Sequence, residues 1–225
     1  MTLRQLVLPF LLISVLLQGC TLSRAQIRRA DAVVAATVDT SVNCDQPDHC
    51  ATPSPLLDAA DRALAVSTAQ QPVHVVTLLD DSEPALAARI NLIRAAHHTI
   101  DIPTYIWAKA DAGLLVLDEL INAARRGVKV RILADQLGSL NDPGLLARLA
   151  RASDNLEIRL YNPTFDEASN NIAEYTVSVL CCFHRFNQRM HNKLFLVDDA
   201  VGITGGRNYE DRYYDWDPQL DFLDR

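Results

Sequence analysis

The hydrophobic pattern of residues 73–161 alternates between two periods. Short β-branched or alternating runs, which are typical of strands, are followed by segments whose apolar residues lie three or four positions apart, as in helices. Strands are predicted at 73–79, 99–107, 128–135 and 156–161, and helices are predicted to begin near Ser82, Asp111 and Asp142. Strands that alternate with helices need crossover connections. The pattern therefore predicts an α/β fold, with a mixed β-sheet flanked by helices on both faces.

The first twenty residues follow a different pattern. Arg4 precedes a continuous apolar run of 12 residues, 6–17, which is shorter than the roughly 20 residues that cross a bilayer and fits the core of a signal peptide. The run leads into LQGC, which resembles the lipobox of bacterial lipoproteins. The resemblance implies a signal peptide at 1–19, lipidation of Cys20 and a periplasmic membrane anchor, with the outer membrane favoured. The alternative is an ordinary signal peptide with a chance cysteine.

Residues 20–72 lack sustained periodicity, and we interpret them as a tether that contains a short helix near 55–64. Since an exported chain can form disulfides, Cys44 and Cys50 are candidates to close a small loop. The Cys181–Cys182 pair lies in an apolar run, where cysteines usually behave as small buried hydrophobes. The domain with candidate chemistry is then 73–225.

Composition narrows the class of partner. Hydrophobic residues make up 49% of the 225, as in a globular protein, and the formal net charge is −7. Proteins that bind nucleic acid without sequence preference need basic surfaces. Nucleic acid is therefore not the expected partner, although a local basic patch would change that.

The stretch RMHNKLFLVDDAVGITGGRN, residues 189–208, carries the candidate chemistry. In an extended strand, His191 and Lys193 project from one face and Asp198 from the other. A turn at Asp198–Asp199 would return the chain and bring Gly205, Gly206 and Asn208 back to the His/Lys end. A histidine, an ammonium, an amide and close backbone can together hold a phosphoryl group. Asp198 is grouped with His191 and Lys193 in the candidate catalytic motif, and we expect it to stabilise the turn and not to touch phosphate.

This spacing resembles the HKD motif of the phospholipase D superfamily. IDIPTYIW, INAARRGVKVRILADQLGS and LYNP extend the resemblance to the N-terminal half of bacterial cardiolipin synthases of the exported type C kind. The resemblance implies a phosphatidyltransferase that acts on phospholipid phosphodiesters through a phosphohistidine at His191. It implies that Lys193 and Asn208 hold the phosphate and that no metal or other cofactor is needed. It also implies that an acidic residue, here matched to Asp224, orients the histidine.

The family uses two HKD motifs, whereas this sequence contains one. We expect the second motif to come from a missing C-terminal half or from a second copy in a homodimer. The alternatives are a dimeric HKD nuclease or phosphodiesterase and an inactive fragment. The apolar stretch 171–183 is an unusual insert before the motif. We expect it to be a buried strand or helix, with a membrane-facing lip as the alternative.

Overall fold

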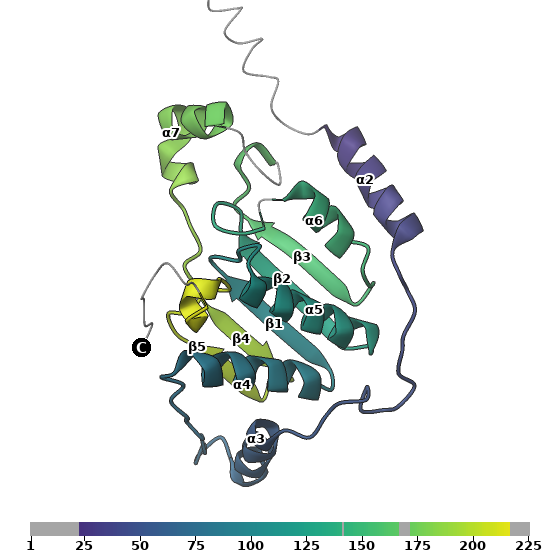
Figure 1. Cartoon of the computed structure of the whole chain (residues 1–225), viewed down its shortest axis with the longest axis vertical. Coiled ribbons are helices and arrows are strands. Elements are labelled where there is room, and N and C mark those ends of the chain that lie inside the picture. The colour runs from purple at the N-terminus through teal and green to yellow at the C-terminus, as the bar shows by residue number, and fades with distance from the viewer. Residues whose placement is uncertain (1–22, 141, 167–171, 217–225) are drawn as a thin grey trace, which may run out of the picture.

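The computed structural model describes residues 23–140, 142–166 and 172–216. Its centre is a five-stranded mixed sheet in the order β3-β2-β1-β4-β5 (Figure 1). The strands are β1 (Thr99–Thr104), β2 (Lys129–Asp135), β3 (Leu156–Tyr161), β4 (Leu194–Val197) and β5 (Val201–Thr204). The helices are α2 (Arg24–Thr37), α3 (Pro55–Val66), α4 (Ser82–Ala95), α5 (Asp111–Arg125), α6 (Pro143–Leu149) and α7 (Ile172–Phe186), with short 3₁₀ turns at Thr164–Asp166 and Asp211–Tyr214.

Strand direction confirms the mixed sheet. β1, β2 and β3 run parallel, and Ile100 pairs with Val130 and Ile102 with Ile132. β4 joins β1 antiparallel, and β5 returns antiparallel to β4. The C-terminal ends of β1, β2 and β3 therefore lie at the same sheet edge as the beginning of β4. In open α/β sheets this edge is where ligands usually bind.

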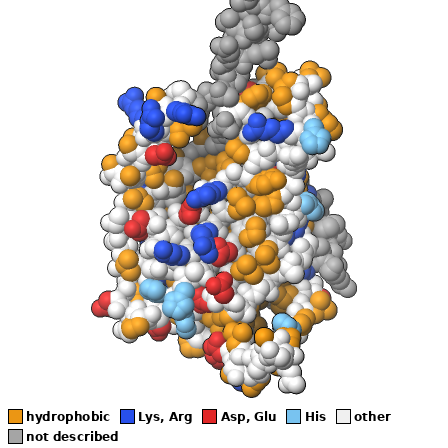
Figure 2. All heavy atoms as spheres, turned by 180° about the vertical axis from the view of Figure 1, so that it is seen from behind, with side chains coloured by type: hydrophobic (Ala, Val, Ile, Leu, Met, Phe, Trp, Pro, Cys, Tyr) orange, Lys and Arg blue, Asp and Glu red, His pale blue; other side chains and the backbone are white. Residues whose placement is uncertain are grey.

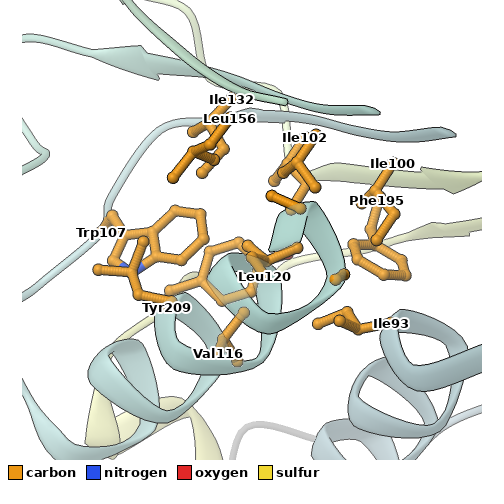
Figure 3. Packing of buried hydrophobic residues seen from close by; sticks show 14 of the residues in the cluster. Ile93, Ile100, Ile102, Trp107, Val116, Leu120, Ile132, Leu156, Phe195 and Tyr209 are labelled. Carbon is orange, nitrogen blue, oxygen red and sulfur yellow. The ribbon is translucent and has the colours of Figure 1, made fainter. Parts of the chain in front are cut away.

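The core lies between the sheet and helices α4 and α5 (Figure 3). Alternate β1 residues, Ile100 and Ile102, are buried against Ile93 of α4 and Leu120 of α5. Two helix ends follow local sequence signals, whereas Asp111, a candidate cap, is the first residue of α5. Asp142 caps α6 by accepting a hydrogen bond from the Leu145 amide, and Gly127 follows α5 with a φ of 108°.

The opposite face of the sheet is open in the described residues. Arg131 of β2 and Asp101 of β1 form an ion pair on it, with side chains 55% and 25% exposed. Figure 2, which shows the molecule from this side, has basic and acidic side chains together in the middle of the face. The α/β class is confirmed, whereas helices cover only one face of the described sheet. The reason is that successive crossovers step in one direction, which places α5 and α6 on the same side.

Residues 73–79 do not form the predicted strand. They have no regular secondary structure, and Val76 is 91% exposed. The Arg207 guanidinium holds the end of this segment by donating to the carbonyls of Leu79 and Asp80. A β-branched run favours strand locally, but a strand needs a neighbouring backbone, and no described strand pairs with this segment.

The predicted tether is partly attached to the domain. α2 has no buried residue, whereas α3 confirms the predicted short helix and packs Leu56 and Leu57 against the core. Cys44 and Cys50 form a disulfide. The folded body thus includes residues before the predicted boundary at 73. Among the described residues, no helix is both long and apolar enough to cross a bilayer.

The described part of the stretch 171–183, which begins at Ile172, is helical and mostly exposed. α7 stands away from the sheet (Figure 1), and Leu180 is 81% exposed. Cys181 and Cys182 are exposed and disulfide-bonded to each other, so the prediction of two buried thiols is wrong. Apolar composition predicted burial, but α7 lies outside the packed layers, and of its residues Ser178 and Phe186 are buried.

Candidate active site

A tight hairpin carries the predicted motif. β4 and β5 pair from Leu194–Thr204 to Val197–Val201, and the turn places Asp198 and Asp199 at φ values of 52° and 54°. Positive φ at both central residues is typical of the turn type that fits the strand twist, and Asp tolerates this conformation better than most residues. The strand is shorter than predicted, since His191 lies before it in a segment without regular secondary structure. The hairpin brings the start of β4 next to the end of β5.

His191 and Lys193 meet at the sheet edge where the parallel strands end. The Lys193 ammonium nitrogen lies 3.2 Å from His191 Nε2, and an antiparallel bridge joins Lys193 to Thr104 at the end of β1. An ammonium can only donate, so the Nε2 lone pair faces it and the ring proton of a neutral imidazole belongs on Nδ1. The two side chains lie on one face, as predicted.

Tyr105 forms the aromatic wall of this pair. Its ring centroid lies 4.8 Å from that of His191 and 5.3 Å from the Lys193 ammonium. The backbone below it is tightly packed: Ser139 donates to the Tyr105 carbonyl, and a Cβ on Gly138 would lie 2.6 Å from that oxygen. Gly138 is therefore needed for this close approach. The sequence prediction quoted Tyr105 without giving it a role, although a polar aromatic residue directly after a strand was a usable signal.

Burial also affects Lys193. Partial desolvation lowers the pKa of its ammonium below the ordinary value of 10.5. The positive charge is consequently held at some cost, next to the imidazole and above the Tyr105 ring.

Asn208 reaches the same edge from the end of β5. Its side chain is buried, and its Oδ1 accepts a hydrogen bond from the Ile106 amide at 3.2 Å. Tyr209 fixes the segment by stacking on Trp107, with ring centroids 4.2 Å apart. With its oxygen used by the protein backbone, the Asn208 amide nitrogen is the group suited to donate to a ligand oxygen.

Gly205 and Gly206 are exposed in the turn after β5. A Cβ built on either would meet nothing within 4 Å, and neither has a positive φ. Packing in the described residues does not explain these glycines. The open space in front of them is compatible with close approach of a ligand to the backbone.

Asp198 lies at the other end of β4. It follows His191 by seven positions, which is on the order of 20 Å along an extended chain. Its carboxylate accepts hydrogen bonds from three backbone amides: His97 at 2.7 Å, His98 at 2.7 Å and Thr99 at 2.8 Å. It therefore joins the hairpin turn to the start of β1 and does not belong to the His191 cluster.

Asp135 positions the backbone before His191, and the sequence analysis gave it no role. The fully buried carboxylate ends β2, pairs with the Arg189 guanidinium at 3.1 Å and accepts from the Met190 amide at 2.9 Å. The Arg189 side chain is 11% exposed. A buried charge of this kind needs such partners. An acidic residue that ends an apolar strand was the available signal. Asp224 and Cys20 lie outside the described residues.

The fold and this cluster correspond to a known family. Residues 89–222 match the family profile described as cardiolipin synthase, PLD-like domain. The chain therefore belongs to the phospholipase D-like cardiolipin synthase family, as the resemblance predicted.

Similar curated proteins extend this result. The chain is 41% identical over 138 residues to cardiolipin synthase C of Escherichia coli, covering 60% of this chain and 28% of that protein. It is 40% identical over 156 residues to an uncharacterized protein of Helicobacter pylori strain J99, covering 69% and 30%. The chain thus spans less than a third of these relatives' length.

The solved structures that align with the chain are more distant. Nuc of Salmonella typhimurium, a phospholipase D family member, aligns with a TM-score of 0.38 at 20% identity, covering 56% of this chain and 66% of that one. Phosphatidylserine synthase of Haemophilus influenzae aligns with a TM-score of 0.44 at 18% identity, covering 73% and 35%. At this level of similarity, neither structure bears on activity.

Proposed function

We propose that this chain supplies one half of a phosphatidyltransferase site that acts on phospholipid phosphodiesters. The observation that carries the proposal is the 3.2 Å contact between His191 Nε2 and the Lys193 ammonium. Asn208, whose Oδ1 accepts a hydrogen bond from the Ile106 amide, lies at the same sheet edge. A nucleophilic nitrogen, a cation and an amide donor on one edge suit a phosphoryl group, whose transition state spreads negative charge over its oxygens.

The first chemical step is attack by His191 on phosphorus. An entering phosphate oxygen takes the Lys193 ammonium as its partner, which releases the Nε2 lone pair. The new N–P bond forms as the bond from phosphorus to the leaving alcohol's oxygen breaks, and that oxygen takes a proton from a general acid. In the second step an acceptor alcohol attacks the phosphohistidine, gives its proton to the same group and breaks the N–P bond.

The general acid in this scheme is a second histidine. The sequence contains one His-x-Lys motif of this type, at 191–193. A second motif would come either from elsewhere in a longer polypeptide or from a second copy of the chain, since a two-fold axis can place two equivalent histidines together.

We further propose that the substrate is a phosphatidylglycerol-like lipid and that lipidation of Cys20 holds the chain on the periplasmic side of a membrane. The LQGC sequence supports the anchor, and 41% identity to a cardiolipin synthase supports the lipid substrate. An anchored enzyme would meet its substrate at the surface where both reside.

The test separates nucleophilic attack from the need for a second motif. The full chain is mixed with a soluble phosphodiester whose leaving group is nitrophenolate, which needs no proton to depart. We expect a burst of nitrophenolate and alkali-stable phosphate on the protein, both absent from His191→Ala. His74→Ala, an exposed histidine outside the site, serves as the matched control. A burst that survives His191→Ala would refute the proposal, and cleavage of labelled DNA without transfer from lipid would favour the nuclease alternative.

A further inference from the structure

The outer side of α7 exposes apolar residues that the protein body does not cover. Ile172 is 87% exposed, Leu180 81% and Phe183 58%. The helix is kinked at Cys182, where φ is −139° and ψ is 32°, so the helical period does not relate Phe183 to the other two, and what the three residues share is their exposure. We call these three residues the outer apolar face of α7. Figure 2 shows hydrophobic side chains gathered at the upper right, the end of the molecule that bears α7.

The side of α7 that faces the protein carries both a polar and an apolar buried residue, Ser178 and Phe186. Ser178 is fully buried and donates to the Glu174 carbonyl, while Glu174 itself is half-buried. Thr176, His184 and Arg185 are exposed. The apolar residues of α7 are thus divided between the protein side and the solvent side, and those on the solvent side are available to an apolar partner.

The end of α7 is fastened close to the candidate nucleophile. The Asn162 amide donates to the carbonyls of Arg185 and Gln188, both at 2.8 Å. The Arg189 guanidinium then lies over the Phe186 ring, 5.5 Å from its centroid, and pairs with Asp135. Phe186 precedes His191 by five positions, a reach of at most about 18 Å. Whatever the outer apolar face contacts is thus held near the active-site edge.

Charge at this end complements an anionic surface. The chain carries a formal charge of −7, yet on α7 the exposed charged side chain is Arg185, beside the exposed His184. The helical part of α7 before the kink, residues 172–181, is about 15 Å long, too short to span a bilayer of roughly 30 Å but suited to lie in its surface.

We propose that the outer apolar face of α7 docks on an anionic phospholipid surface and delivers lipid headgroups to His191. This inference rests on the proposed function, because a phospholipid must present its phosphodiester to the site while its acyl chains stay in the membrane. An interfacial helix just before the nucleophile meets both requirements.

Contact is tested with two matched tryptophan probes in the full chain. Leu180→Trp and Leu78→Trp replace leucines that are 81% and 82% exposed, the second far from α7 in sequence and outside regular structure. The vesicles contain phosphatidylglycerol with brominated acyl chains, which quench only tryptophan in the bilayer, and the parent chain's emission is subtracted. We expect the probe at 180 to be quenched and the probe at 78 not. Equal quenching at both positions, or none at 180, would overturn the proposal.

Leu180→Asp tests the consequence for activity, with Leu78→Asp as its control. On phosphatidylglycerol vesicles we expect about a tenfold loss for Leu180→Asp, because it removes buried apolar area and adds an anion at the surface. On the soluble nitrophenyl phosphodiester we expect no loss. An equal loss on both substrates, or a change in the chain's sedimentation without vesicles, would instead make α7 a structural or protein-binding element. If the parent chain gives no nitrophenolate burst, the proposed function fails, while the quenching result still decides docking.

Discussion

The two ends of β4 have opposite environments. At one end, His191 is exposed and Lys193 half-buried, beside an aromatic ring and open space. At the other end, the Asp198 carboxylate is engaged by the three amides of residues 97–99. One short motif therefore contains an exposed histidine, which can meet a ligand, and an aspartate whose hydrogen bonds all serve the fold. The comparison teaches that residues joined in one sequence pattern need not act in one place.

The same contrast separates two acidic residues near the motif. Asp135 holds the backbone directly before His191, whereas Asp198 holds the start of β1 at the far end of the hairpin. The His191 end of β4 is thus positioned by Asp135 of β2, a strand that is distant in sequence, and not by the motif's own aspartate.

The largest expected effect is a loss of activity, without loss of stability, on substitution of His191. His191→Ala should lower the rate of nitrophenolate release by about 10⁴-fold or more, because the proposed mechanism has no other nucleophile. Denaturant unfolding should show little change, since the side chain is exposed. His74→Ala should match the parent in both measurements, and a large fall in stability for His191→Ala would mean that the residue is structural.

The next largest effect is on stability, at the Asp135–Arg189 pair that positions the backbone before His191. Asp135→Asn should reduce the free energy of unfolding by about 3–5 kcal/mol, because it leaves the buried Arg189 without its counter-ion. Asp101→Asn breaks the exposed pair with Arg131 and should cost less than about 1 kcal/mol. Chemical denaturation of both variants checks this, and equal costs would show that burial of the first pair is unimportant.

A smaller effect on the free energy of unfolding is expected at the Asp198 end of β4. Asp198→Asn should cost about 1–3 kcal/mol, because the new amide group cannot accept from all three backbone amides. Asp199→Asn is the matched control, since that residue is exposed and has the same positive φ. Its free energy of unfolding should stay near the parent's. If the two substitutions had equal effects, the turn conformation would matter rather than the three hydrogen bonds.

The smallest effect is a shift in pH dependence. Burial lowers the pKa of Lys193 below 10.5, so its ammonium loses a proton at lower pH than that of free lysine. Activity that needs this charge should be complete below the lowered pKa and should fall as the pH rises through it. In Lys193→Arg the guanidinium stays protonated, so whatever activity remains should lack this alkaline fall. An identical alkaline limb in both proteins would assign it to another group.

Much of the fold could be predicted because local signals agreed with packing. The periodicity of 99–161 gave the strands and helices, and the aspartate pair gave the hairpin turn. The strand predicted at 73–79 was wrong because strand propensity does not supply a neighbouring strand to pair with. The predicted burial of the stretch that forms α7 was wrong because composition does not say which side of a helix meets solvent.

The candidate site was predicted in part. Spacing alone placed His191 beside Lys193 and returned Asn208 to the same edge. Asp198 was expected to stabilise its own turn, and the structure shows that it also anchors residues 97–99. Asp135 and Tyr105 come from other strands, so their approach to the motif depends on the sheet order, which a single sequence does not specify.

The account's central claim is that chemistry belongs to the His191 end of β4 and that the Asp198 end only supports the fold. The most direct test is the burst of nitrophenolate per folded molecule for Asp198→Asn, measured where unfolding data show the variant to be folded. The account predicts a burst equal to the parent's, in contrast to its loss in His191→Ala. A burst as small as that of His191→Ala would place Asp198 in the chemistry and contradict the claim.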